Sequence, residues 1–292
     1  MSAPTYGVRS SVAQLRRVAV RRPWVGDGGS ADEVLAQYRA AHWSEPALAL
    51  LTAQHAAFVT TLRTLGSEVH EFDALPGLPD AVFVYDPAFV IPSGTVALTP
   101  AKLARMGEEE YLVADLESVG VPTIGRLVGD ATADSGDMFW LDDATVAIGR
   151  SYRTNDEAVA QLRGILAGDG VRVEMFDVPH DLGPAFCLHL MSLVSPIRDD
   201  LAVVYERLAP VALLRALARR GITWVAVEDD EYATLGCNVL AISPGVVVIG
   251  ERNRRVADAL RDRGVEVHTY PSSEIDKGEG GPTCLTRPIL RG

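Results

Sequence analysis

Cys284 is the residue of this sequence best placed to act as a nucleophile. It lies in Lys-Gly-Glu-Gly-Gly-Pro-Thr-Cys-Leu-Thr (277–286), where three glycines and a proline predict a loop that leads into a strand. A thiol at such a junction can be accessible, and the deprotonated thiol is a strong nucleophile. A small buried hydrophobic side chain is an equally good interpretation of this segment. For Cys187 and Cys237, which lie in apolar, strand-like surroundings, the buried interpretation is favoured.

Acidic side chains and a histidine lie at the ends of predicted strands. Asp80 and Asp86 flank Ala-Val-Phe-Val-Tyr, which is predicted to be a strand, and Asp134 and Asp137 flank Ser-Gly in a predicted hairpin. Single aspartates at turns usually form the turn, but four of them at strand ends in two successive units indicate a site. His189 also follows an apolar run, and taken alone it would more often be a core histidine.

The polar residues recur at a nearly constant spacing. Asp86, Asp137, His189, Asn238 and Cys284 each precede a predicted hairpin, and they are 51, 52, 49 and 46 residues apart. A period near 50 residues indicates a repeat, although α/β chains alternate their elements anyway and the period could be a coincidence. The helix in each interval excludes an all-β propeller. We therefore predict five strand–strand–helix–strand units around one axis, with their equivalent polar residues meeting at one end.

Short β-rich runs and amphipathic stretches would position these residues. The last strand, near 284–290, is expected to pair with the first and to close the ring. The less regular stretch 26–41 is predicted to be a loop or a lid. The predicted strands are 15–20, 81–85, 96–99, 146–149, 171–176, 201–205, 223–227 and 245–249, and the predicted helices are 46–65, 102–119, 155–166, 210–220 and 252–263.

The composition limits the classes of function. The chain has 292 residues, of which 48% are hydrophobic and 23% charged, as in globular proteins. Its length would allow two domains, but the repeat favours one domain over 1–292. A formal net charge of −12 argues against nucleic acid and favours cationic small molecules. The sequence has no run long enough to span a membrane, no visible signal peptide and three scattered cysteines, and it predicts a reduced, cytoplasmic protein.

Six segments in this order resemble the guanidino-group-modifying enzymes, the superfamily of arginine deiminases, amidinotransferases and dimethylarginine dimethylaminohydrolases. The resemblance runs from about residue 6 to the C-terminus. It is closest to the dimethylarginine dimethylaminohydrolases, because they share the Arg-Thr-Asn that follows the Asp-x-Gly-Asp hairpin. Arginine deiminases carry His-x-Asp, whereas this chain has Met191 in the third position of that motif. The resemblance implies a single-domain α/β fold, the five-bladed propeller with pseudo-fivefold symmetry called the pentein fold. The matching segments are 80–86, 134–137, 149–155, 189–190, 238–240 and 280–284.

The resemblance implies a cysteine-dependent mechanism. Cys284 would be the nucleophile, His189 the general acid and base, and Asp134 the carboxylate that orients and charges the histidine. Attack on the guanidinium carbon would give a covalent S-alkylthiouronium intermediate, which water then hydrolyses. No metal or organic cofactor is expected.

The resemblance also implies three contacts to the substrate. Asp86 would grip the guanidinium, Asp80 would lie near the α-amino group, and Arg153 would pair with the α-carboxylate. On its own, Arg153 is typical of a surface arginine before a helix. A guanidinium is cationic, planar and rich in donors, so carboxylates are the groups expected to recognise it.

Some positions depart from the family pattern. Tyr85 replaces a glutamate, and Ser135 replaces the first glycine of Gly-Gly. Thr-Pro-Ala-Lys (99–102) stands in place of Thr-Arg-Pro-Gly, whose arginine binds the substrate carboxylate, and Lys102 or Arg105 could substitute for it. These departures concern the amino-acid end of the substrate and leave the catalytic set intact.

The expected function is hydrolysis of a small cationic guanidino compound, with N-methylated arginine as the leading candidate, giving citrulline and an amine. Alternatives are an amidinotransferase or an arginine deiminase-like enzyme, and a non-catalytic binding protein on the same fold. We expect no nucleic-acid or membrane partner, and a homodimer is possible.

Overall fold

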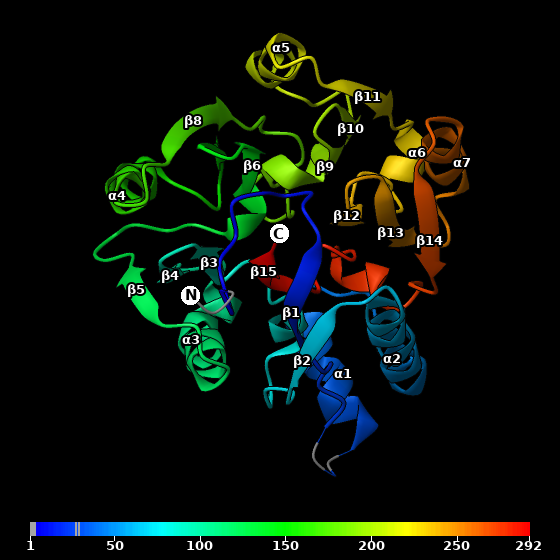
Figure 1. Cartoon of the computed structure of the whole chain (residues 1–292). Coiled ribbons are helices and arrows are strands. Elements are labelled where there is room, and N and C mark those ends of the chain that lie inside the picture. The colour runs from blue at the N-terminus through cyan, green and yellow to red at the C-terminus, as the bar shows by residue number, and fades with distance from the viewer. Residues whose placement is uncertain (1–3, 27, 29) are drawn as a thin grey trace.

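The computed structural model describes residues 4–26, 28 and 30–292, and in these residues fifteen strands form five three-stranded sheets. The sheets succeed one another around a common centre, and the long helices lie on the outside of the ring (Figure 1).

Each sheet repeats one construction. In one of them, β6 (Met138–Asp142) and β7 (Thr145–Arg150) form an antiparallel hairpin, α4 (Asp156–Ala167) follows, and β8 (Arg172–Asp177) pairs parallel with β7. Three further sheets are β3 (Ala88–Ile91), β4 (Gly94–Ala97) and β5 (Thr123–Arg126) with α3 (Glu108–Ser118); β9 (Val194–Arg198), β10 (Leu201–Val204) and β11 (Thr223–Ala226) with α5 (Val211–Arg219); and β12 (Leu240–Ser243), β13 (Val246–Gly250) and β14 (Glu266–Tyr270) with α7 (Arg254–Asp262).

The fifth sheet joins the two ends of the described chain. β15 (Arg287–Arg291) pairs antiparallel with β1 (Leu15–Arg21), and β1 pairs parallel with β2 (Glu68–Phe72) after α2 (Leu48–Thr64). The prediction that the last strand closes the ring on the first is confirmed. Closure pairs the edge that the terminal strand would otherwise expose.

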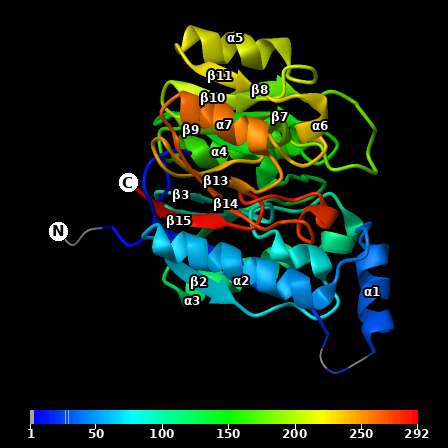
Figure 2. The ribbon, with the colours of Figure 1, turned by 90° about the vertical axis from the view of Figure 1, so that its right-hand side faces the viewer.

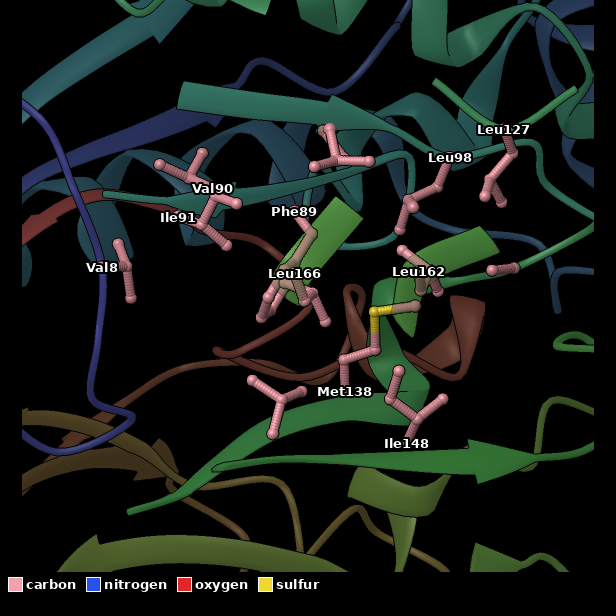
Figure 3. Packing of buried hydrophobic residues seen from close by; sticks show 14 of the residues in the cluster. Val8, Phe89, Val90, Ile91, Leu98, Leu127, Met138, Ile148, Leu162 and Leu166 are labelled. Atoms are coloured by element: carbon pink, nitrogen blue, oxygen red, sulfur yellow. The ribbon is translucent and has the colours of Figure 1, made fainter. Parts of the chain in front are cut away.

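The core lies between the sheets and the outer helices. Leu162 and Leu166 of α4 are fully buried and belong to one hydrophobic cluster with Met138, Ile148 and Phe89, which come from two neighbouring sheets (Figure 3). The middle strand β7 is buried along almost its whole length, because its side chains pack on one face in the cluster that contains α4 and on the other in a cluster that contains residues of β9 and β10.

Two sequence predictions are wrong in detail. The run 81–85 is not a strand, because its first residues continue a 3₁₀ helix, Pro79–Val82, whose proline presets the helical φ. The stretch 26–41 contains α1 (Ala31–Ala40), which begins with Ser30 and Glu33 in a capping box. Asp27 and Gly29 of this stretch lie outside the described residues.

The five recurrent polar residues come together as expected. Asp86, Asp137, His189, Asn238 and Cys284 each precede the hairpin or strand that begins a new sheet. Asn238 contacts Cys284, His189 lies 4.0 Å from Asp86, and Asp137 accepts from the backbone N–H of the residue after His189. α1 lies at one end of the ring and the C-terminus at the other (Figure 2). Among the described residues, no helix is both long and apolar enough to cross a membrane.

Candidate active site

The thiol of Cys284 is held by an asparagine from the preceding unit. Cys284 is half-buried in a turn before β15, and Asn238 Nδ2 donates a hydrogen bond to its sulfur at 3.1 Å. Asn238 Oδ1 accepts from the backbone N–H of Thr283 at 3.0 Å, so one side chain orients both the sulfur and its backbone. The sequence had indicated Asn238 as a repeat position and as part of a segment that resembles the family, without a role in the site, and the spacing was the signal that could have placed it there.

The environment keeps Cys284 protonated at neutral pH. Burial, with a smaller contribution from the charge of Asp86, raises the pKa of the Cys284 thiol to about 11, against the hydrogen bonds from Gly281 and Asn238. The thiol therefore needs a nearby positive charge before it can act as a nucleophile at neutral pH.

The glycines before Cys284 permit close packing. A Cβ on Gly278 would lie 2.2 Å from the ring of Trp43, and one on Gly280 would lie 2.3 Å from the ring of Phe83. The left-handed residue of this loop is Glu279, with φ of 61°. The glycines thus allow the loop to approach the aromatic side chains that flank the cleft.

His189 lies between two carboxylates. Its Nε2 is 3.1 Å from Asp134 Oδ2, and its Nδ1 is 3.6 Å from the sulfur of Cys187 and 4.0 Å from Asp86 Oδ1. Burial alone would lower the pKa of His189, but Cys187, Asp86 and Asp134 together raise it well above the ordinary value. The two carboxylates thus favour the protonated imidazole, which can donate a proton from Nδ1.

Asp134 and Asp137, the predicted carboxylate pair, differ in their hydrogen bonding. Asp134 is fully buried, and its Oδ1 has no hydrogen-bond partner among the described residues. Asp137 is a structural anchor, since it accepts from Ser151, Thr154 and the backbone N–H of Leu190. Burial raises the pKa of Asp137 to about 6.

Asp86 is already paired within the chain. Its Oδ2 is 2.5 Å from Arg105 Nη1, and its Oδ1 accepts from the backbone N–H of Gly136 at 3.1 Å. Arg105 also binds Glu108, at 2.8 Å, and all three charged side chains are buried. Burial would raise the pKa of Asp86, but Arg105 holds it below the ordinary value.

Asp80 is likewise satisfied inside the chain. Its Oδ1 accepts from the indole N–H of Trp43 at 2.7 Å and its Oδ2 accepts from Lys102 Nζ at 2.6 Å. Lys102 also donates to the carbonyl of Ala41 at the end of α1. His42, beside Trp43, contributes to the cleft wall.

Arg153 is the cation of this cleft that the chain leaves free. It is buried, makes no ion pair with any described residue, and its Nε has no hydrogen-bond partner among them. Lys102 and Arg105, the proposed substitutes for the family's missing arginine, are both paired with carboxylates. Arg153 is therefore the group best able to receive an anionic part of a ligand.

The other two cysteines differ from each other. Cys237 is buried in the core, as predicted, and its thiol contacts the carbonyl of Val203. The same prediction is wrong for Cys187, which is half-buried in the loop before His189 and lines the cleft. The loop leaves the core because Gly183 and Pro184 interrupt the run after β8.

These groups line one narrow, charged cleft of about 40 Å³. All six predicted site residues, including Cys284 itself, therefore line this cleft, together with Cys187. Among the described residues, no group of three His, Cys, Asp or Glu side chains is arranged to hold a metal ion. The arrangement instead offers a thiol, a proton donor and a carboxylate oxygen without a partner.

The sequence comparisons identify the family. The arginine deiminase family model matches residues 74–221 and 211–291. The chain belongs to the arginine deiminase family. YkgA of Bacillus subtilis strain 168, which is 32% identical to this chain, aligns over 86% of this chain and 85% of its own length. Arginine deiminase of Listeria welshimeri is 29% identical over 79% of this chain and 66% of that enzyme, so the chain spans slightly less than two thirds of it.

Solved structures of this superfamily share the fold. Dimethylarginine dimethylaminohydrolase from Pseudomonas aeruginosa, solved as a mutant complexed with citrulline, superposes with a TM-score of 0.79 at 20% identity, over 96% of this chain and 100% of that one. The N-terminal domain of an arginine dihydrolase from Cyanobacteria, bound to its product, gives 0.78 at 18% identity, over 94% and 97%. The predicted α/β propeller, the pentein fold, is confirmed.

Proposed function

We propose that this protein is a cysteine-dependent hydrolase of a small cationic guanidino compound, with N-methylated arginine as the leading substrate. The whole chain would act as one catalytic domain. The observation that carries the proposal is the cleft itself, where the thiol of Cys284, the imidazolium of His189 and the unpartnered Oδ1 of Asp134 converge.

Substrate binding would supply what the free site lacks. A guanidinium N–H would donate a hydrogen bond to Asp134 Oδ1 and would offset the free-energy cost of burying that oxygen without a partner. The same positive charge would counter the burial that raises the pKa of Cys284. The thiol proton then leaves to solvent, and the thiolate forms with the substrate in place.

The chemistry would run in two halves. The sulfur of Cys284 attacks the guanidinium carbon, and His189 gives its Nδ1 proton to the departing nitrogen as the C–N bond breaks. Neutral His189 then takes a proton from a water, whose oxygen attacks the thiouronium carbon. The C–S bond breaks, and a ureido product and the free thiol remain. Arg153 would hold the substrate carboxylate, and Asp80 with Lys102 would line the amino end.

Arginine itself is the second candidate substrate. The Listeria relatives carry the name arginine deiminase, and the family model has the same name. In that reaction the departing group is ammonia, so the same residues would serve.

A substrate panel tests the proposal. Purified protein is incubated with arginine, monomethylarginine, dimethylarginine and shorter guanidino acids, and ureido product and released amine are measured. We expect turnover that Cys284→Ala abolishes and that Cys237→Ala, at the buried core cysteine, retains. Turnover by Cys284→Ala, or none by the unmodified protein on any member, contradicts the proposal. An amine acceptor added in parallel separates hydrolysis from amidino transfer.

A further inference from the structure

A second cavity, of about 300 Å³, adjoins the charged cleft at the reacting groups. The two cavities share Cys187, His189, Glu279 and Cys284 in their walls. The second is far larger than the cleft of about 40 Å³ and is of a size typical of small-molecule sites. The proposed function, as described above, places no part of the substrate in this second cavity.

The wall of this cavity is mainly apolar. Its polar members Asn238, Thr283 and Ser192 have their side chains engaged inside the protein. Asp181 and Glu279 are exposed, and among the described lining residues none is lysine or arginine. The two carboxylates disfavour an anionic group, and the apolar wall favours an apolar group. The apolar side chains are Leu182, Phe186, Leu188, Met191, Tyr232 and Leu235.

The proton donor faces this cavity. Nε2 of His189 is held by Asp134, so Nδ1 is the nitrogen that can serve the departing group. Nδ1 is 3.6 Å from Cys187, and a Cβ on Gly136 would approach it to 2.3 Å. Gly136 lines only the large cavity and Cys187 lines both cavities, whereas Asp80 and Arg153 line only the charged cleft. A nitrogen that takes this proton therefore lies where the two cavities meet, beside the mouth of the apolar cavity.

We infer that the departing nitrogen of the substrate carries a bulky apolar substituent, such as a butyl or benzyl group, which this cavity binds. The inference rests on the proposed hydrolase function and names its substrate class. Water and R–NH–C(=NH₂⁺)–NH–R′ give R–NH–CO–NH₂ and R′NH₃⁺, where R′ is the apolar group. A single methyl group leaves most of the cavity empty, since about 150 Å³ suffices for benzene in another protein.

The test is a series of Nω-substituted arginines: methyl, butyl and benzyl. We expect kcat/KM to rise about fourfold for each added methylene that is buried, with citrulline and the apolar amine as products. A flat or falling series overturns the inference while the proposed function stands. Release of ammonia with retention of the apolar group on the ureido product overturns it as well. Absence of turnover on every guanidine means instead that the proposed function has failed.

Two further measurements separate binding from turnover. Ala233, exposed directly after the short helix Asp229–Tyr232, lines the cavity, and Ala233→Leu should lower kcat/KM for the benzyl substrate at least tenfold and leave the methyl substrate nearly unchanged. Ala218→Leu, on the exposed face of α5, is the matched control. In Cys284→Ala protein, calorimetry should show benzylguanidine binding at least tenfold more tightly than methylguanidine, and equal affinities would overturn the inference.

Discussion

The guanidinium of Arg105 lies 2.5 Å from the carboxylate of Asp86, and both side chains are buried. The group expected to grip the guanidinium of the substrate therefore already holds one from its own chain. Glu108 binds the same arginine and completes a buried three-charge cluster. In the wall of the charged cleft, the carboxylate oxygen left for a ligand is Oδ1 of Asp134, which has no partner among the described residues.

Asp86 and Asp134 should therefore respond differently to removal of their charge. Asp86→Asn removes one of the two carboxylates that neutralise the buried charge of Arg105. We expect the free energy of unfolding to fall by about 3 kcal/mol, as when other buried ion pairs are broken. Asp134→Asn should reduce kcat/KM at least about 100-fold with a much smaller loss of stability, because the lost charge serves the ligand and His189. Denaturant unfolding and steady-state kinetics measure both effects. Equal stability losses would contradict this division.

The buried thiol predicts a steep pH dependence of alkylation. Because the pKa of Cys284 is raised to about 11, the thiolate fraction in the free protein should increase about tenfold per pH unit from pH 7 to pH 10. A guanidinium ion that cannot be hydrolysed should accelerate iodoacetamide labelling of Cys284 at pH 7.5. Labelling is followed by mass spectrometry, with Cys237→Ala and Cys187→Ala proteins to assign the site. Fast labelling at pH 7 without any ligand would show that the thiol is already ionised.

Gly136 is predicted to be required for the position of His189. A Cβ there would lie 2.3 Å from Nδ1 of His189 and 2.9 Å from Asp86 Oδ1, so Gly136→Ala must displace the imidazole. We expect kcat to fall about 100-fold, as for displacements near 1 Å in other active sites. Gly164→Ala is the control, since its Cβ meets nothing within 4 Å on α4 and should stabilise the helix slightly. Retained activity in Gly136→Ala would place the proton donor elsewhere.

Arg153 should act on the carboxylate end of the substrate. Arg153→Ala is expected to raise KM for a methylated arginine about 10- to 100-fold with a smaller change in kcat, because the contact is equal in the ground and transition states. A decarboxylated guanidine should show no such increase. Arg163→Ala, on the exposed face of α4, is the matched control. A loss confined to kcat would assign Arg153 a part in the chemical step.

Much of the architecture follows from patterns that are local in sequence. Strand runs, helical periodicity and the spacing from Asp86 to Cys284 predict five equivalent units and the convergence of their polar ends, since each unit folds by the same rules. The family resemblance then picked out Cys284, His189 and Asp134, which the structure places in one cleft.

The partners of these residues are decided by tertiary structure alone. Nothing within the segments around Asp86 and Asp80 shows that Arg105 and Lys102 would neutralise them, because those cations arrive from 19 and 22 residues further along the chain. Likewise, Cys187 in its apolar run has the sequence signature of a core residue, and only the path of the loop before His189 places it in the wall of the site. Charge compensation and cavity shape depend on long-range packing, and periodicity carries no information about them.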